Sequence, residues 1–170
     1  MTTHTQAREF AHQALTALFG IEPTEGEIKA LAGIACLETH YGDGWKGAGA
    51  GSYNMGAIQC ANQWASKWFS YGDTKPKTDG SSTKYAARFR KYDSAVDGWV
   101  DLVKVAYVNR GRHIVREAAQ TEDWLGVSTG LHSTVYYEGF GKTAADRIHN
   151  HLVALTGAIA RADEEALAGR

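Results

Sequence analysis

Hydrophobic residues recur every three or four positions along most of the chain, which predicts a largely helical protein. The first such stretch predicts a helix over residues 5–19 that ends at Gly20. Thr24 and Glu27 then match a capping box, in which each side chain bonds the backbone N–H of the other residue. They predict the start of a second helix that continues to Tyr41.

The middle of the chain changes to an alternating pattern, which is typical of strands. It predicts a small antiparallel hairpin, with residues 69–75 paired to residues 82–92 and a turn at Asp79-Gly80. The remaining patterns predict helices over residues 59–70, from Ser94 to Tyr107, over residues 112–119, after Thr121, and from Thr143 onward. The fold class is therefore α+β and mostly helical.

One carboxylate, that of Glu38, lies on the apolar side of the second predicted helix, near its C-terminal end. At about 100° per residue it falls between Leu31 and Ile34 on that side. Burial there raises the pKa of a carboxyl group and favours its protonated form. Cleavage of a glycosidic bond needs such a proton donor, so we interpret Glu38 as a general acid. The alternative is a glutamate that reaches water or pairs with an arginine.

A glycine-rich loop follows this helix and leads into the string Ser52-Tyr53-Asn54-Met55-Gly56-Ala57-Ile58-Gln59. No Gly-Lys-Ser/Thr follows the glycines and no strand precedes them, so the loop is not a phosphate loop. Glycine lets backbone approach a ligand closely. We therefore expect the loop and the string to line a sugar-binding cleft beside Glu38.

Composition limits the classes of function. The chain has 170 residues, 44% hydrophobic and 22% charged, which predicts one globular domain over residues 1–170. The 18 basic and 19 acidic residues give no excess of positive charge, so no nucleic-acid partner is expected. No apolar run is long enough to span a membrane, and the N-terminus does not resemble a secretory signal. Export would need another route, a removed segment or cell lysis.

The cysteine and histidine residues do not predict a disulfide, a catalytic pair or a metal site. Cys36 and Cys60 are too few for a disulfide scaffold, so we expect free thiols. Cys36 and His40 share a helix face, but that face is turned away from Glu38 and has no third group to orient a catalytic pair. His149 and His151 fall on different helix faces. We expect neither a metal nor a cofactor.

Four motifs follow one another along the chain: Glu38-Thr39-His40-Tyr41-Gly42, the string at 52–59, Phe89-Arg90-Lys91-Tyr92-Asp93-Ser94, and Tyr136-Tyr137-Glu138-Gly139-Phe140-Gly141. In this order they resemble the lysozyme-like superfamily of peptidoglycan-cleaving enzymes. The first three are closest to its β-N-acetylglucosaminidase branch, typified by flagellar and autolytic enzymes. Met55-Gly56-Ala57-Ile58-Gln59 is instead closer to lytic transglycosylases, so the resemblance leaves hydrolysis and transglycosylation both open.

This resemblance implies a helical body and a small hairpin lobe that form a cleft for peptidoglycan glycan strands. Glu38 would protonate the glycosidic oxygen. The branch usually places a glutamate on the first hairpin strand, where the nearest acid here is Asp73. Asp73 is our candidate for a second carboxylate. Otherwise the N-acetyl oxygen of the sugar could attack, or a transglycosylase could use Glu38 alone.

The resemblance also implies substrate contacts at Ser52, Tyr53, Asn54, Gln59, Tyr136 and Tyr137. Asn54 and Gln59 could read the polar edges of a sugar or brace the loop through backbone bonds. Either tyrosine could hold the acetamido group, or lie in the core with a satisfied hydroxyl. A non-catalytic module of a phage tail or injection particle is the competing hypothesis, and an active domain could also reach the cell wall as a subunit of such a particle.

Overall fold

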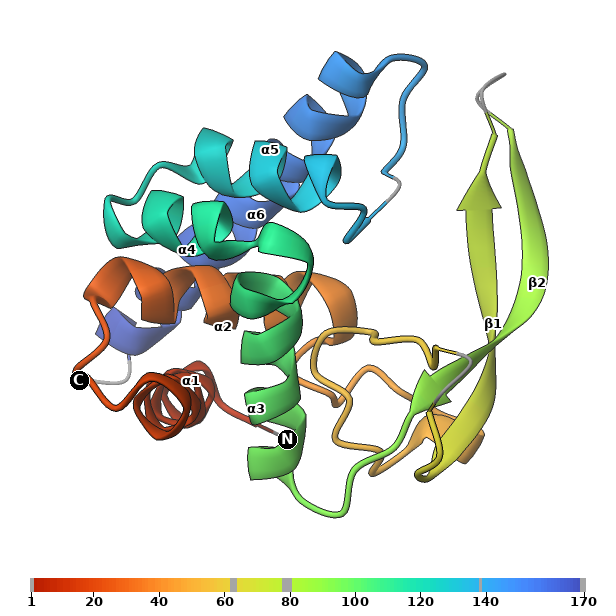
Figure 1. Cartoon of the computed structure of the whole chain (residues 1–170), viewed down its shortest axis with the longest axis horizontal. Helices are drawn as coiled ribbons and strands as arrows, with labels where there is room; N and C mark the ends of the chain where they lie inside the picture. Colours follow the sequence, from red (N-terminus) through yellow and green to blue (C-terminus); the bar gives the residue numbers. More distant parts are fainter. Residues whose placement is uncertain (1, 62–63, 78–80, 138, 169–170) are drawn as a thin grey trace.

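The computed structural model describes residues 2–61, 64–77, 81–137 and 139–168. Figure 1 shows a helical body with a two-stranded hairpin projecting from one side of it. The described elements are α1 (His4–Phe19), α2 (Glu25–Thr39), β1 (Trp68–Pro76), β2 (Ser82–Arg90), α3 (Ala95–Val103), α4 (His113–Gln120), α5 (Trp124–Ser133) and α6 (Ala144–Ala168), with short helical turns at Gly47–Gly49, Lys104–Val108 and Asn109–Gly111. This arrangement confirms the predicted α+β, mostly helical class.

Local side-chain caps explain where most helices begin. The Thr24 hydroxyl accepts a hydrogen bond from the backbone of Glu27 at the start of α2, and the Glu27 side chain accepts one from the Thr24 backbone. Ser94 caps α3, and Thr143 with Asp146 forms the predicted reciprocal pair before α6. These bonds satisfy N–H groups that have no partner within the helix.

Helix α2 runs through the middle of the body and contacts α1, α4 and α6. Most of its length is buried, including Leu31, Ile34 and Ala35, which are fully inaccessible to solvent. Trp99 and Tyr107 are the largest fully buried side chains of the core. A helix enclosed on several sides is held rigidly, so its last turn is a fixed platform for Glu38.

The hairpin matches the predicted strands closely. Antiparallel pairing places Phe69 opposite Phe89 and Asp73 opposite Tyr85. Because side chains alternate between the two faces of a strand, these four lie on one face. Phe69 and Phe89 form a second small core with the ring of Trp45, 5.0 Å from each. The predicted turn at Asp79-Gly80 lies outside the described residues.

The predicted helix over residues 59–70 is wrong. Gln59 instead forms an isolated bridge with Phe89, and the backbone N–H of Cys60 donates to the Arg88 carbonyl at 2.8 Å. Strand β1 then begins at Trp68. Pairing to a distant strand satisfies the backbone of residues 58–60, and the large apolar residues that suggested a helix pack around the hairpin.

One prediction further along the chain also needs correction. Helix α5 is capped by Asp123, whose carboxylate accepts from the backbone of Gly126 at 2.9 Å, and not by Thr121. The chain around Tyr136 is a turn, and Val135 before it has a φ of 57°. A β-branched residue is strained in that left-handed conformation, so the surrounding contacts must hold this turn in place.

Candidate active site

Glu38 occupies the last turn of α2, where the chain leaves the helical body. The neighbouring Thr39 is buried, and its hydroxyl donates to the Met55 carbonyl at 2.7 Å, which ties the helix end to the string at 52–59. His40 and Tyr41 both have positive φ, so the chain reverses direction sharply after the helix. Glu38 itself stays partly exposed at this reversal.

Two effects raise the pKa of Glu38 to about 7, namely burial and then the negative charge of Asp73. Burial penalises the ionised carboxylate, and a nearby like charge penalises it further. A large fraction of Glu38 is therefore protonated at neutral pH, as a proton donor must be. The alternative of an arginine-paired glutamate does not fit, since neither cause of the shift is a positive charge.

Gln59 and Tyr85 are hydrogen-bond donors to the carboxylate of Asp73. Its Oδ2 accepts from Gln59 Nε2 at 2.8 Å and from the Tyr85 hydroxyl at 2.9 Å. Gln59 Nε2 also lies 3.0 Å from the Tyr85 oxygen. The three side chains thus form one cluster, and Gln59 braces the predicted second carboxylate.

Tyr85 was missed by the sequence analysis as a site residue. It was recognised only as part of an alternating strand, and its cross-strand pairing with Asp73 depends on the register of the hairpin. Counting back from a two-residue turn at Asp79-Gly80 would have placed Asp73 opposite Ala86, so the pairing with Tyr85 could not be predicted from the turn.

Asn54 and Ser52 are completely buried. The Asn54 side chain accepts from the Ile58 N–H at 2.8 Å and donates to the carbonyls of Ile58 and Arg90 at 2.9 and 3.0 Å. The Ser52 carbonyl accepts from the Tyr92 N–H at 2.9 Å. These bonds fit the bracing role considered for Asn54, and direct contact of either buried side chain with substrate does not fit.

The adjacent tyrosines lie in different surroundings. The Tyr136 hydroxyl donates to the Gly56 carbonyl at 3.1 Å, in the string beside Glu38. Burial and, secondly, the charge of Glu38 hold the pKa of Tyr136 well above its usual value, so the two side chains are neighbours. Arg112 lies over the Tyr136 ring at 5.4 Å and bonds Thr134, which fixes the turn from below.

Tyr137 belongs to the helical body. Its ring stacks on His151 with centroids 4.0 Å apart, and its hydroxyl donates to the Ser128 carbonyl at 3.0 Å. His151 is buried, and burial followed by the nearby His132 lowers its pKa to about 4, so it is neutral at physiological pH. Tyr137 therefore anchors the turn to α5 and α6, and leaves Tyr136 as the tyrosine next to Glu38.

Glycine at position 56 permits this close approach. A Cβ atom there would lie 2.9 Å from the Tyr136 hydroxyl oxygen and 2.6 Å from Leu102 Cδ1. Both distances are too short for ordinary contacts, so a side chain at Gly56 would displace Tyr136. The backbone at Tyr53 is also unusual, with a φ of 53°, and the Tyr53 side chain is 40% exposed.

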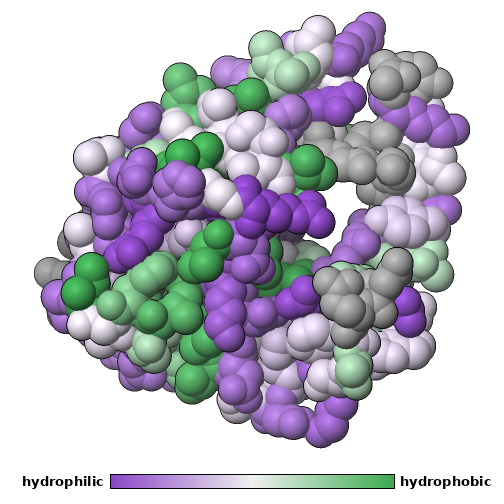
Figure 2. Space-filling view, in the orientation of Figure 1, coloured by the Kyte–Doolittle hydropathy of each residue, from purple (hydrophilic) through white to green (hydrophobic). Residues whose placement is uncertain are grey.

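Figure 2 shows an opening between the hairpin and the helical body. Glu38 comes from the body, Asp73 from the hairpin and Tyr136 from the turn before α6. After burial, Asp73 contributes to the raised pKa of Glu38, and Glu38 to the raised pKa of Tyr136. Glu38 therefore lies near both residues, although all three are far apart in the sequence. This grouping can donate a proton and stabilise a positive charge that develops beside it.

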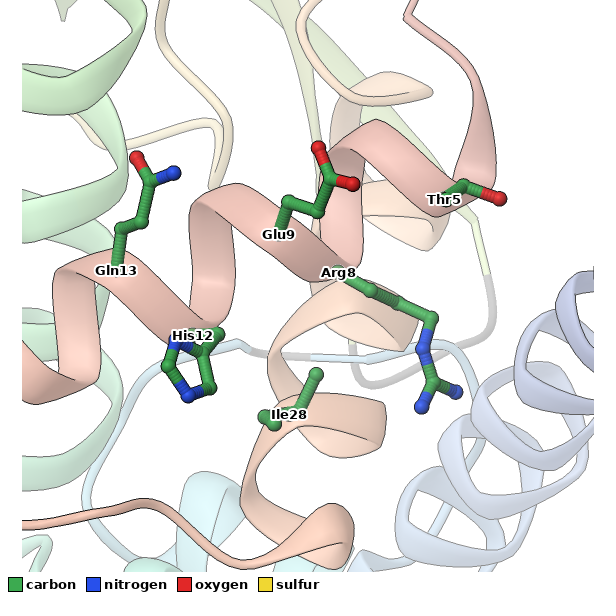
Figure 3. A pocket seen from close by; sticks show the side chains of 6 residues that line it. All are labelled: Thr5, Arg8, Glu9, His12, Gln13 and Ile28. Carbon is green, nitrogen blue, oxygen red and sulfur yellow. The ribbon is translucent and has the colours of Figure 1, made fainter.

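A separate cavity of about 330 Å³ lies between α1 and α2 (Figure 3). It is lined by Thr5, Arg8, Glu9, His12, Gln13 and Ile28. Arg8 forms an ion pair with Glu25 and a weaker one with Asp163 at 3.4 Å. No residue predicted to bind substrate lines this cavity, so it is not part of the Glu38 site.

Other predicted features can be located as well. Cys36 and Cys60 are free, partly buried thiols, as expected. Across the described ranges, no three His, Cys, Asp or Glu side chains are grouped as ligands of a metal ion would be. Among those same residues, no helix combines the length and apolar character that a membrane span requires.

No protein-family profile matches the sequence, and no curated protein sequence is similar to it. Solved structures are similar. The peptidoglycan hydrolase from Sphingomonas sp. A1 aligns with a TM-score of 0.65 and 20% identity over 96% of this chain and 91% of its own. The glycoside hydrolase domain of FlgJ from Salmonella typhimurium aligns with a TM-score of 0.61 and 22% identity over 95% and 87%. This chain has their fold.

A third similar structure is the catalytic domain of the autolysin Auto from Listeria monocytogenes. It has a TM-score of 0.60 and 14% identity, over 94% of this chain and 82% of the autolysin domain. All three alignments extend over nearly the whole chain, so they include both the helical body and the hairpin. They confirm the helical body with a small hairpin lobe that the sequence motifs implied.

Proposed function

We propose that this chain cleaves the glycan strands of peptidoglycan by hydrolysis, with Glu38 as the general acid. The observation that carries the proposal is the carboxyl group of Glu38, whose pKa is raised to about 7 by burial and by Asp73 on the facing hairpin. Most glycosidases use a pair of carboxyl groups whose different surroundings keep one protonated and the other ionised. The similar folds of two peptidoglycan hydrolase and glycoside hydrolase structures support the same reaction class.

In this mechanism Glu38 donates its proton to the glycosidic oxygen as the bond to the sugar breaks. The sugar ring then carries positive charge, which the Asp73 carboxylate stabilises directly or by activating a water molecule. Gln59 and Tyr85 keep Asp73 in one orientation through the bonds to its Oδ2. Proton donation and charge stabilisation thus come from opposite sides of the opening.

Tyr136 is the tyrosine that we assign to the substrate. Its hydroxyl lies beside Glu38 and donates to the Gly56 carbonyl, so the hydroxyl oxygen can still accept a hydrogen bond from the N–H of an acetamido group. Tyr53 is our candidate for a contact with the outer part of the glycan, because its ring is exposed at the edge of the string. Asn54 and Ser52 are buried, and we assign them to holding the backbone of the string at 52–59 in place.

Digestion of purified peptidoglycan tests the proposal. We expect Glu38→Gln to lower the rate by a factor of about 10² to 10⁴, since Gln cannot donate the proton. Glu117→Gln, on the exposed surface of α4, is the matched control and should retain full activity. Undiminished activity of Glu38→Gln would rule out the mechanism, and an inactive wild type that still binds sacculi would identify a non-catalytic module.

Mass spectrometry of the products separates the possible bonds. Reducing N-acetylglucosamine ends indicate a glucosaminidase, which we expect, and reducing muramic acid ends indicate a muramidase. Anhydro ends would show that Glu38 acts in a lytic transglycosylase. Delivery to the cell wall by lysis, or as a subunit of a phage tail or injection particle, stays a prediction from the sequence.

A further inference from the structure

Positive charge is concentrated in one part of the chain. Residues 61–92 contain seven Lys or Arg and two Asp, whereas the rest of the chain contains 11 Lys or Arg and 17 Asp or Glu. The basic segment forms the hairpin and its approaches, and the acidic remainder forms the helical body (Figure 1). A nearly neutral protein therefore presents a basic lobe, which attracts polyanions.

The outer face of the hairpin is built differently from the inner face. Phe69 and Phe89 point inward to the small core, so the side chains of Trp68, Ser70, Lys84, Ala86 and Arg88, which alternate with them, point outward. The middle of the outer face consists of Ser70, Gly72 and Ala86, all exposed, and a Cβ atom at Gly72 would meet nothing within 4 Å. The outer face is thus a flat platform of small residues.

An aromatic ring and cations border this platform. Trp68 is 51% exposed, and the guanidinium group of Arg88 lies 5.5 Å from its ring centroid. Lys84 extends the same face two positions beyond Ala86, toward the hairpin tip. Flat sugar rings pack on exposed indole rings, and carboxylates bind Arg and Lys.

Two other cations of the lobe are neutralised by acids of the adjoining chain. Arg90 pairs with Asp101 at 2.7 Å, and Lys67 pairs with Asp93. Arg88 is stacked against Trp68 instead, where a bound carboxylate could reach it from solvent. An anionic glycan matches this combination of ring and charge.

We propose that the outer face of the hairpin, formed by Trp68, Lys84 and Arg88 around the small-residue platform, binds a second, anionic glycan strand of the cell wall. A sugar ring packs on Trp68, and peptide-stem carboxylates pair with the two cations. The inference rests on the proposed function, because that function brings the lobe against a wall made of parallel strands. Asp73 and Tyr85 lie on the opposite face, so this strand is distinct from the one being cut.

Binding at both faces has a measurable consequence. A strand held on the outer face keeps the opening close to neighbouring strands, which raises the effective concentration of substrate. Insoluble sacculi offer both strands together, whereas a short soluble glycan fragment occupies only the opening. Changes on the outer face should therefore affect sacculi and spare soluble fragments.

Sedimentation with purified sacculi tests the proposal, with all variants placed in the inactive Glu38→Gln chain. We expect Lys84→Gln and Arg88→Gln each to weaken binding about two- to fivefold at low salt, with a smaller effect at high salt. Trp68→Ala should weaken binding at either salt concentration. Lys104→Gln, an exposed cation of the helical body, is the matched control and should bind normally.

Three results would overturn the proposal. Unchanged binding by a variant that combines Trp68→Ala, Lys84→Gln and Arg88→Gln would show that this face does not bind the wall. Equal binding to sacculi whose carboxylates are amidated would show that ion pairing plays no part. Equal competition by double-stranded DNA would show a general polyanion surface. In the chain that retains Glu38, the same variants should hydrolyse soluble fragments at the wild-type rate. If the chain that retains Glu38 is inactive but its outer-face variants still lose binding to sacculi, the proposed function is refuted and the proposed binding surface is not.

Discussion

The behaviour of Glu38 depends on its immediate surroundings. A glutamate on the apolar side of a helix could reach water or pair with a cation, but the helix end fixes Glu38 beside Tyr136 and opposite Asp73. Burial and a like charge both disfavour its ionised form. The arrangement that keeps a large fraction of Glu38 protonated near neutral pH therefore also makes the ionised form a source of instability there.

This instability predicts a pH-dependent effect of Glu38→Gln. The folded pKa of about 7 lies above the ordinary value of 4.5, so ionised Glu38 opposes folding as the pH rises through 7. At about pH 8 the variant should exceed the wild type in free energy of unfolding by up to about 3 kcal/mol, and the advantage should disappear below about pH 4.5. Urea denaturation across this pH range measures it; a difference that does not vary with pH would contradict it.

Tyr85→Phe tests the orientation of Asp73. The change removes a donor to the Asp73 carboxylate and leaves the ring in place, so the carboxylate is held less firmly. We expect kcat on purified peptidoglycan to fall by about two- to tenfold. Tyr71→Phe, on the same face of the hairpin, is the control and should keep the wild-type kcat. An unchanged kcat of the Tyr85 variant would show that Tyr85 does not position Asp73 for the reaction.

At the scale of elements, helix packing positions the string that contains Asn54. Helix α3 begins at its Ser94 cap and passes so close to the string that a Cβ atom at Gly98 would lie 1.8 Å from the Tyr53 carbonyl oxygen. The positive φ of Tyr53 occurs at this contact. The shape of the string is thus set by a helix that follows it in the sequence.

Two glycine substitutions in helices should have opposite effects. Gly98→Ala forces α3 away from the string, and we expect the free energy of unfolding to fall by about 1–3 kcal/mol, together with loss of activity. Gly157→Ala in α6 meets only the end of Arg161 at 3.8 Å and should stabilise the protein by about 0.5–1 kcal/mol. Thermal unfolding of both variants compares them directly. Equal effects would show that the Gly98 contact is not important.

Over the whole molecule, one carboxylate joins the hairpin to the helical body. Asp101 of α3 accepts hydrogen bonds from Arg90, at the end of β2, and from the Tyr92 hydroxyl. The ion pair is mostly shielded, because 17% of each side chain is exposed. These contacts of Asp101 hold the hairpin against α3 and thereby fix the position of Asp73 relative to Glu38. Neither Asp73 nor Glu38 takes part in them.

Asp101→Asn should weaken these contacts. It leaves the Arg90 guanidinium without its counter-charge, and we expect a loss of about 2 kcal/mol in the free energy of unfolding. Since the hairpin also shifts, kcat should fall by about tenfold or more. Asp93→Asn breaks the exposed pair with Lys67 and should cost less than about 1 kcal/mol. An Asp101 variant no more affected than the Asp93 variant would contradict this role.

The sequence by itself determined the features that depend on neighbouring residues. Capping pairs such as Thr24 with Glu27 predicted where helices begin, and strand alternation predicted the hairpin. The apolar side of α2 drew attention to Glu38, and the loop and motifs that follow it favoured the prediction of a general acid. These signals are local, because a cap, a turn or a helix face involves residues at most a few positions apart.

Only the tertiary structure decided which side chains meet across long sequence separations. It separated Tyr136, bonded to Gly56 80 positions away, from Tyr137 in the helical body. It also buried Asn54 against the end of β2. Such partners are chosen by packing and backbone pairing between distant segments, which a local pattern does not contain. The same reason explains why residues 58–60 pair with β2 instead of forming a helix.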